Sequence, residues 1–136
     1  MLMPKELDLM HPCGLHIAKG LSERGVNAID GVQTRDMQTG YVWYNLPQGE
    51  IAGRVVAMSL CFFKQQLDRL SVAVIDEALY GSSWDDWTAE KEEVRAVATG
   101  RWLADVGYVV GKYPWGTVHA GTDPKTGDGS GSIMLT

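Results

Sequence analysis

The sequence predicts an α+β domain in which an antiparallel sheet of about five strands carries a long helix and an N-terminal helix packed on it. Three observations lead to this class. Apolar residues recur at helical spacing between residues 87 and 106, they alternate with period two from residue 41 onward, and two strand-like segments flank a glycine-rich loop near the C-terminus. A length of 136 residues fits a single domain over residues 1–136.

The N-terminal helix is expected over residues 9–25. Pro12 suits the first helical position, and Cys13, Ile17 and Leu21 form an apolar side at a spacing of four. Gly25 is the expected end of this helix. A short strand over residues 26–32 and a polar connection over residues 33–40, with a turn at Gly40, are expected to follow.

The sheet is expected to be built from two hairpins and a preceding strand over residues 41–44. Residues 54–63 are nearly apolar on both faces, which predicts a central strand, and the chain returns through residues 69–75 to complete the first hairpin. The second hairpin joins residues 117–122 to residues 132–135. Its loop, residues 123–131, contains three glycines, which predict a mobile connection.

The long helix is expected over residues 88–106. Thr88 is a candidate N-cap, Ser83 with Asp86 is an alternative capping pair, and Gly107 is placed to end the helix in a left-handed conformation. Leu103 is expected to point away from the buried side. The residues predicted to form that buried side are Trp87, Val94, Ala98, Trp102 and Val106.

Composition limits the possible partners. The net charge of −5 and the pI of about 5.1 disfavour binding to nucleic acid or to an anionic membrane, because both are bound through excess Lys and Arg. The opening residues lack the apolar core of a secretory signal, and no apolar run is long enough to cross a membrane. A cytoplasmic protein with two reduced cysteines and no cofactor is therefore expected.

Cys13 is the best candidate for a catalytic residue. At a helix start its thiol would be activated by the helix amides, and His119 with Asp123 would supply a base and its orienting group. That order of residues looks like papain-like and cell-wall amidase hydrolases, so a hydrolase or amidase using Cys13 and His119 is the alternative function. The other interpretation of Cys13 is a core thiol beside Ile17 and Leu21, and we therefore expect no catalytic residues.

Two metal sites can be considered from residue types. His11, Cys13 and His16 provide at most three ligands, and nothing downstream completes the set that zinc prefers. Asp123 and Asp128 do not follow the calcium-loop spacing, and Lys125 lies between them. We therefore expect no bound metal, with two surface histidines and a hairpin tip as the simpler interpretations.

An acidic run at the start of the long helix is the strongest candidate for a binding surface. The simple interpretation is a solvated first turn that complements the helix dipole. Two tryptophans beside sharp turns favour a second interpretation, in which carboxylates steer a basic partner toward an aromatic anchor. The predicted contact residues are Trp84, Asp85, Asp86, Glu90, Glu93 and Trp115.

Four segments of the C-terminal half carry a resemblance to a known group of proteins. They are WDDWTAEKEEVR at residues 84–95, WL at 102–103, YPWG at 113–116 and DPKTG at 123–127. Together, over residues 82–136, they resemble small bacterial immunity-type proteins encoded beside polymorphic or type VI secreted toxins. The resemblance implies a protein that binds one cognate toxin domain and blocks its active site without doing chemistry.

Overall fold

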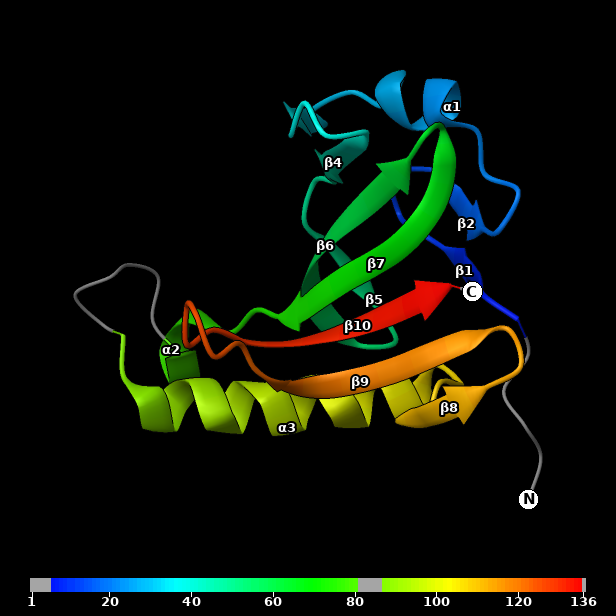
Figure 1. Ribbon diagram of the computed structural model, residues 1–136. Helices are drawn as coiled ribbons and strands as arrows, with labels where there is room; N and C mark the ends of the chain where they lie inside the picture. Colours follow the sequence, from blue (N-terminus) through cyan, green and yellow to red (C-terminus); the bar gives the residue numbers. More distant parts are fainter. Residues whose placement is uncertain (1–5, 81–86, 136) are drawn as a thin grey trace.

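The computed structural model describes residues 6–80 and 87–135, and an antiparallel eight-stranded sheet dominates it. The strands follow the order β3-β4-β6-β7-β10-β9-β8, with β5 pairing to β6 beside this path (Figure 1). These strands are β3 (Gln33–Asp36), β4 (Tyr41–Asn45), β5 (Gly49–Ile51), β6 (Arg54–Phe63), β7 (Gln66–Val74), β8 (Gly111–Tyr113), β9 (Gly116–Thr122) and β10 (Gly129–Leu135).

Both predicted hairpins are present. The β6–β7 hairpin occupies the centre of the sheet, as its nearly apolar strands predicted, and β9 pairs with β10 as the second hairpin. The turn of the first hairpin consists of Lys64 and Gln65, which have φ angles of 48° and 71°. Positive φ at both central residues matches the right-handed twist of the paired strands. The expected strands left residues 64–68 for this turn, so the observed turn of two residues is shorter than expected.

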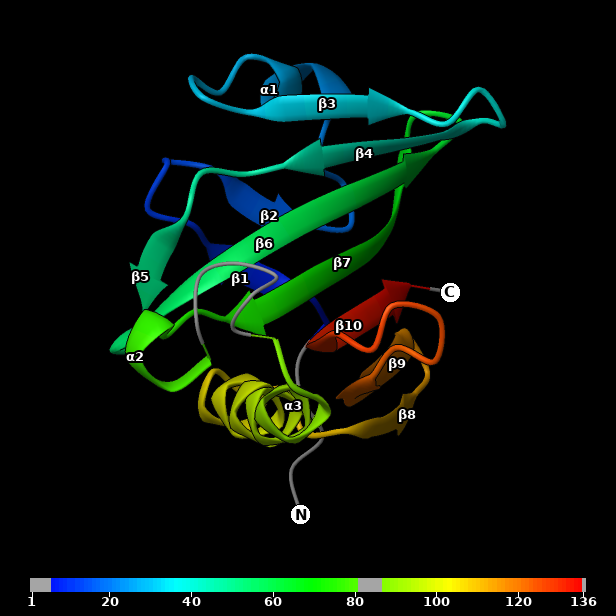
Figure 2. The ribbon, with the colours of Figure 1, turned by 90° about the vertical axis from the view of Figure 1, so that its left-hand side faces the viewer.

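The described residues form three helices beside the sheet: α1 (Glu23–Asn27), α2 (Glu77–Tyr80) and the long helix α3 (Ala89–Asp105). Figure 1 shows α3 running beneath β9 and β10, and Figure 2 views it along its axis. The predicted caps of α3 are confirmed. The Thr88 side chain accepts the Lys91 N–H, and Gly107 has a φ of 103° that lets the Tyr108 N–H return to the Leu103 carbonyl.

The predicted fold class is wrong in the number of strands and in the N-terminal helix. A separate two-stranded sheet, β1 (Asp8–Met10) with β2 (His16–Ala18), stands where the helix over residues 9–25 was expected. Leu9 of β1 and Ile17 of β2 are buried, as are Leu7 and Leu15 just before the strands, and they alternate with more exposed neighbours at the period of a strand. Gly14, with a φ of 94°, makes the turn between the strands. The spacing of four between Cys13, Ile17 and Leu21 was therefore coincidental.

Short strands account for the rest of the difference. All four residues of β3 are exposed, so the edge strand has no apolar pattern that distinguishes it from the polar connection expected there. Residues 26–32, expected to form a strand, instead hold the end of α1 and a turn. Strands of three or four residues at a sheet edge depend on backbone pairing more than on side-chain periodicity.

The buried face of α3 also differs from the predicted stripe. Trp102 is buried as expected, but Trp87 is 37% exposed and Val94 is 53% exposed, while Leu103 is completely buried. The residues that face the sheet are Glu92, Ala96, Thr99, Trp102 and Leu103. The predicted stripe is therefore wrong: α3 is rotated about its own axis relative to the orientation that the stripe predicted.

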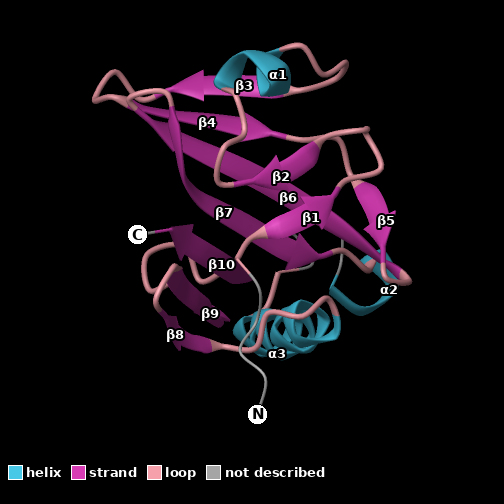
Figure 3. Cartoon of the chain, turned by 90° about the vertical axis from the view of Figure 1, so that its right-hand side faces the viewer, coloured by secondary structure: helices cyan, strands magenta, loops and turns pink. Residues whose placement is uncertain are grey.

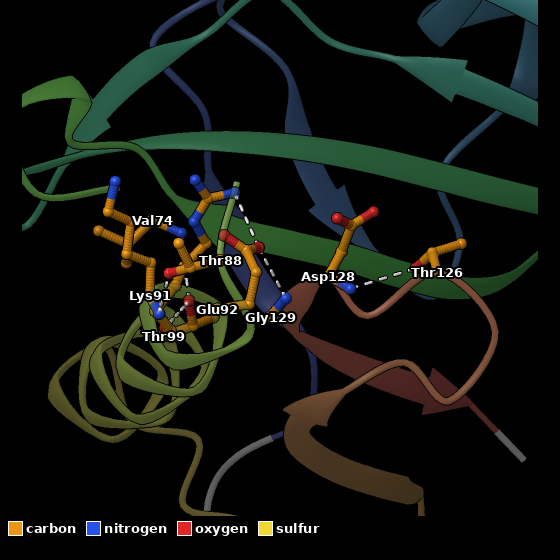
Figure 4. A network of polar contacts seen from close by, with 9 residues as sticks. Val74, Thr88, Lys91, Glu92, Thr99, Thr126, Asp128 and Gly129 are labelled. Carbon is orange, nitrogen blue, oxygen red and sulfur yellow. Dashed lines mark hydrogen bonds and ion pairs between the residues drawn. The ribbon is translucent and has the colours of Figure 1, made fainter. Parts of the chain in front are cut away.

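Close approach between α3 and β10 explains this rotation. A Cβ added at Gly129 would lie 1.9 Å from the Glu92 carbonyl oxygen, and one at Gly131 would lie 2.6 Å from Leu103 Cδ1. The glycines let the backbones come together, so the side of the helix that carries the buried Ala96 and Thr99 fits there. Figure 4 shows Glu92 of α3 beside Gly129. Packing geometry therefore outweighed the burial of Val94.

The two faces of the eight-stranded sheet have different surroundings. One face packs against α3 and the β1–β2 sheet, and Figure 3 shows β1 and β2 lying over it. Its side chains form the core around Met58, Leu60, Leu70, Val72 and Ile133. Figure 2 looks at the opposite face, which we call the open face because no helix of the described residues covers it.

Candidate interaction surface

The structure does not place Cys13 at a helix start. Cys13 lies in the turn between β1 and β2, where its backbone N–H donates to the His11 Nδ1 at 3.1 Å. His119 is exposed on β9, in the other sheet, opposite Ser132 of β10. The helix amides that motivated a nucleophilic Cys13 are absent from its surroundings, so the geometry offers that function no support.

Each histidine near the N-terminus has a protein partner at one ring nitrogen. His16 Nε2 lies 2.5 Å from Asp8 Oδ1 across the β1–β2 pair, while His11 is 3% exposed. Burial lowers the pKa of His11, because an imidazolium there would lose its hydration. Within residues 6–80 and 87–135, no three His, Cys, Asp or Glu side chains gather closely enough to hold a metal ion.

The glycine-rich loop is anchored to its own backbone and to α3. Asp123 Oδ1 accepts the N–H groups of Lys125 and Thr126, and the Asp123 N–H donates to the Asp128 carbonyl at 2.9 Å. The Gly129 N–H donates to a Glu92 carboxylate oxygen at 3.0 Å. These bonds give the loop a defined turn, and its mobility stays a prediction.

The predicted contact residues near the start of α3 fall into two groups. Trp84, Asp85 and Asp86 lie outside the described residues, while Glu90 and Glu93 are exposed on the first turns of α3. Glu92 was part of the same acidic run, but it is 2% exposed and pairs with Arg95 at 3.4 Å in addition to Gly129. Only part of the acidic run is thus available to a partner.

Trp115 lies at the other end of α3. It belongs to the turn between β8 and β9, where its ring stacks on Tyr113 at a centroid distance of 5.4 Å and meets the edge of Tyr108 at 6.0 Å. A helix of 17 residues is about 25 Å long at 1.5 Å per residue. The structure therefore does not bring Trp115 into one cluster with Glu90 and Glu93.

The outer side of α3 carries apolar residues that the predicted stripe did not single out as a surface. Val97 is 58% exposed, and it follows Glu90, Glu93 and the exposed Val94 on the side away from the sheet. Helix α2 packs beside α3 and adds exposed Glu77 and Leu79. We call this set the α2–α3 surface; its members are Glu77, Leu79, Trp87, Glu90, Glu93, Val94 and Val97.

A signal for this surface was present in the sequence. Glu90, Val94, Val97 and Arg101 are separated by four, three and four residues, which places them on one side of a helix. In this series Val94 and Val97, both exposed, lie between the carboxylate of Glu90 and the guanidinium of Arg101. The predicted stripe through Trp87 and Val94 assigned Val94 to the core, so Val94 was not recognised as part of an exposed surface.

Comparison with protein families, with curated proteins and with solved structures found no match to this chain. Among the helices of the described residues, none combines the length and the apolar character needed to cross a lipid bilayer.

Proposed function

We propose that the protein is a cytoplasmic immunity-type binding protein that neutralises a cognate secreted bacterial toxin by covering its active site. The observation that carries the proposal is the α2–α3 surface. There, Val94 and Val97 are each more than half exposed and lie beside the carboxylates of Glu90 and Glu93. An apolar centre with charged groups around it is the arrangement that protein interfaces use.

Charge supports the choice of partner. The chain carries a net charge of −5, and the exposed carboxylates of Glu77, Glu90 and Glu93 lie on two helices that pack together. Many enzymes that act on anionic substrates have basic clefts, and opposite charge raises the association rate toward such a cleft. Once the complex has formed, burial of the valines would slow its dissociation.

The proposed contact surface includes Trp84, Asp85 and Asp86, which precede α3 in the chain. Trp115 would be contacted only by a partner that extends along the whole helix. A standard interface of about 800 Å² on each partner is roughly 30 Å across, which is comparable to the length of α3. A single toxin domain is therefore large enough to meet both ends.

Co-expression in a bacterium tests this function. The toxin would be the C-terminal domain of a secreted protein encoded beside this gene, expressed with the wild-type protein or with a Glu90→Lys/Glu93→Lys variant. We expect the wild type to restore growth and the charge-reversed variant to lose protection. Glu50→Lys, at an exposed position on β5, is the matched control and should protect. Equal toxicity with and without the wild-type protein would contradict the proposal.

A further inference from the structure

Four residues that pair with one another across neighbouring strands form a row on the open face of the sheet. Arg35 of β3 pairs with Trp43 of β4, Trp43 pairs with Cys61 of β6, and Cys61 pairs with Arg69 of β7. Residues directly opposite one another on paired strands project to the same side of a sheet. Trp43 and Cys61 therefore form the middle of a row that has an arginine on each side.

The orientation of this row follows from the alternation of the strands. Gly131 faces Leu103 of α3 and pairs with Val72, which pairs with Met58, so these positions belong to the core face. Cys61 is three residues from Met58 along β6 and therefore projects to the opposite side. The row therefore lies on the open face, which is the face that Figure 2 views.

A hollow of about 340 Å³ lies over three members of this row, Trp43, Cys61 and Arg69. Its lining residues are Met37, Thr39, Tyr41, Trp43, Cys61 and Arg69. Cys61 is 1% exposed, and desolvation raises the pKa of its thiol, so this side chain contributes an apolar and neutral lining. Tyr41 is braced by Phe63, whose ring centroid lies 4.4 Å away. The volume is near the lower end of the range for small-molecule sites.

Cationic groups stand at the margins of this hollow. Arg69 Nε pairs with Asp68 Oδ2 at 2.9 Å, and within the described residues Asp68 is the only side chain paired with that guanidinium. The Nη groups of Arg69 therefore retain donors for a ligand. Arg35 is exposed beside Trp43, while Asp36 is directed to the other side of β3. Asp68 offsets part of the charge of Arg69, and Arg35 adds a second positive charge beside Trp43.

We propose that this hollow is a binding site for a small aromatic anion, with a flat ring against Trp43 and Tyr41 and a carboxylate, sulfonate or phosphate at Arg69. Aromatic rings offer flat apolar area, and an arginine fork binds an oxyanion through two parallel hydrogen bonds. The site is separate from the α2–α3 surface and does not depend on the function proposed there.

A pair of fluorescent probes tests this assignment. The first probe, 8-anilinonaphthalene-1-sulfonate, combines an aromatic ring system with an anion, and the second, N-phenyl-1-naphthylamine, is a neutral relative. Arg69→Gln should weaken sulfonate binding about tenfold, as expected for the loss of a charge-assisted contact, and should change binding of the neutral probe less than about twofold. Trp43→Ala should weaken the binding of both probes.

Control variants separate this site from other apolar surfaces. Arg101→Gln and Val97→Ser alter exposed side chains on α3, and both should leave the binding of the two probes unchanged. The assignment would be overturned if Arg69→Gln and Trp43→Ala left the binding of the sulfonate probe unchanged. It would also be overturned if Val97→Ser abolished that binding. An equal loss of both probes in Arg69→Gln would also overturn it, because the charge would then have no specific role.

Competition by natural anions distinguishes small ligands from a polymer. Thymidine monophosphate should displace the sulfonate probe, and thymidine should do so at least tenfold less well, because it lacks the phosphate. Displacement by a thymidine dodecamer but not by the monophosphate would overturn the small-ligand assignment in favour of single-stranded nucleic acid.

Discussion

The backbone N–H of Gly129 donates a hydrogen bond to the carboxylate of Glu92 at 3.0 Å, across 37 residues of sequence. The same carboxylate pairs with Arg95 at 3.4 Å, and it is almost completely buried (Figure 4). A buried carboxylate is stable only when its oxygens have partners. This contact therefore joins the start of α3 to the first residue of β10 and determines which side of the helix meets the sheet.

Replacement of Glu92 by Ala should lower the free energy of unfolding by about 3 kcal/mol, because it leaves Arg95 and the Gly129 N–H without their partner. Denaturant unfolding of the purified protein measures this change. Glu93→Ala is the control, since Glu93 is exposed on the same turn and its loss should cost less than about 0.5 kcal/mol. Similar losses for the two variants would show that the contact contributes little.

Gly129→Ala should destabilise the protein by more than about 2 kcal/mol, because the new Cβ would lie 1.9 Å from the Glu92 carbonyl oxygen and must displace backbone. Gly25→Ala is the matched control: nothing lies within 4 Å of the added Cβ, and Gly25 is within α1. That control should stabilise the protein slightly, by up to about 1 kcal/mol. The melting temperatures of the two variants should therefore shift in opposite directions. An unchanged melting temperature in Gly129→Ala would contradict the close approach of β10 to α3 at this position.

Trp102→Ala should cost about 3 to 5 kcal/mol, because it removes a ring that is 1% exposed and leaves a cavity beneath the sheet. The indole N–H donates to the Ile51 carbonyl at 2.9 Å, so Trp102→Phe should also be destabilising, by about 1 to 3 kcal/mol. Chemical denaturation measures both losses. A loss below about 1 kcal/mol for Trp102→Ala would place the core elsewhere.

Stability should fall as the pH drops below about 6.5, the ordinary pKa of histidine. Burial lowers the pKa of His11 in the folded chain, so the unfolded chain binds a proton that the folded chain resists, and protonation favours unfolding. His11→Asn retains an acceptor for the Cys13 N–H and removes the titration. We expect unfolding measured between pH 7 and pH 5 to be less pH-dependent in that variant.

His119→Asn serves as the control for this pH series, because His119 is exposed on β9. It should retain the pH dependence of the wild type. A wild-type curve that stays level between pH 7 and pH 5, or one that His119→Asn flattens, would contradict the role assigned to His11.

The parts of the fold that could be predicted from the sequence are those encoded by local chemistry. Thr88 and Gly107 mark the ends of α3 through side-chain and backbone preferences that act within one turn, and β6 is recognisable from apolar residues on both faces. The alternation of Leu7, Leu9, Leu15 and Ile17 was also present, but Pro12 with the spacing of Cys13 and Ile17 favoured a helix instead.

The parts that could not be predicted depend on contacts between distant residues. The rotation of α3 depends on Gly129 and Gly131, which lie in a different element and allow the close approach. The hollow on the open face is likewise formed where Trp43, Cys61 and Arg69 come together from three strands. Of the predicted contact residues, only Glu90 and Glu93 could be related to the exposed valines of α3.

Calorimetric titration of the purified protein with the neighbouring toxin domain, made catalytically inactive, tests the central claim most directly. We expect wild-type binding that weakens as salt increases, and a Glu90→Lys/Glu93→Lys variant that binds at least tenfold more weakly, because charge pairs at an interface lose their attraction on reversal. Val94→Ser/Val97→Ser should also weaken binding, with less effect on the salt dependence. No detectable heat with the wild type, or equal affinities for all three proteins, would contradict binding through the α2–α3 surface.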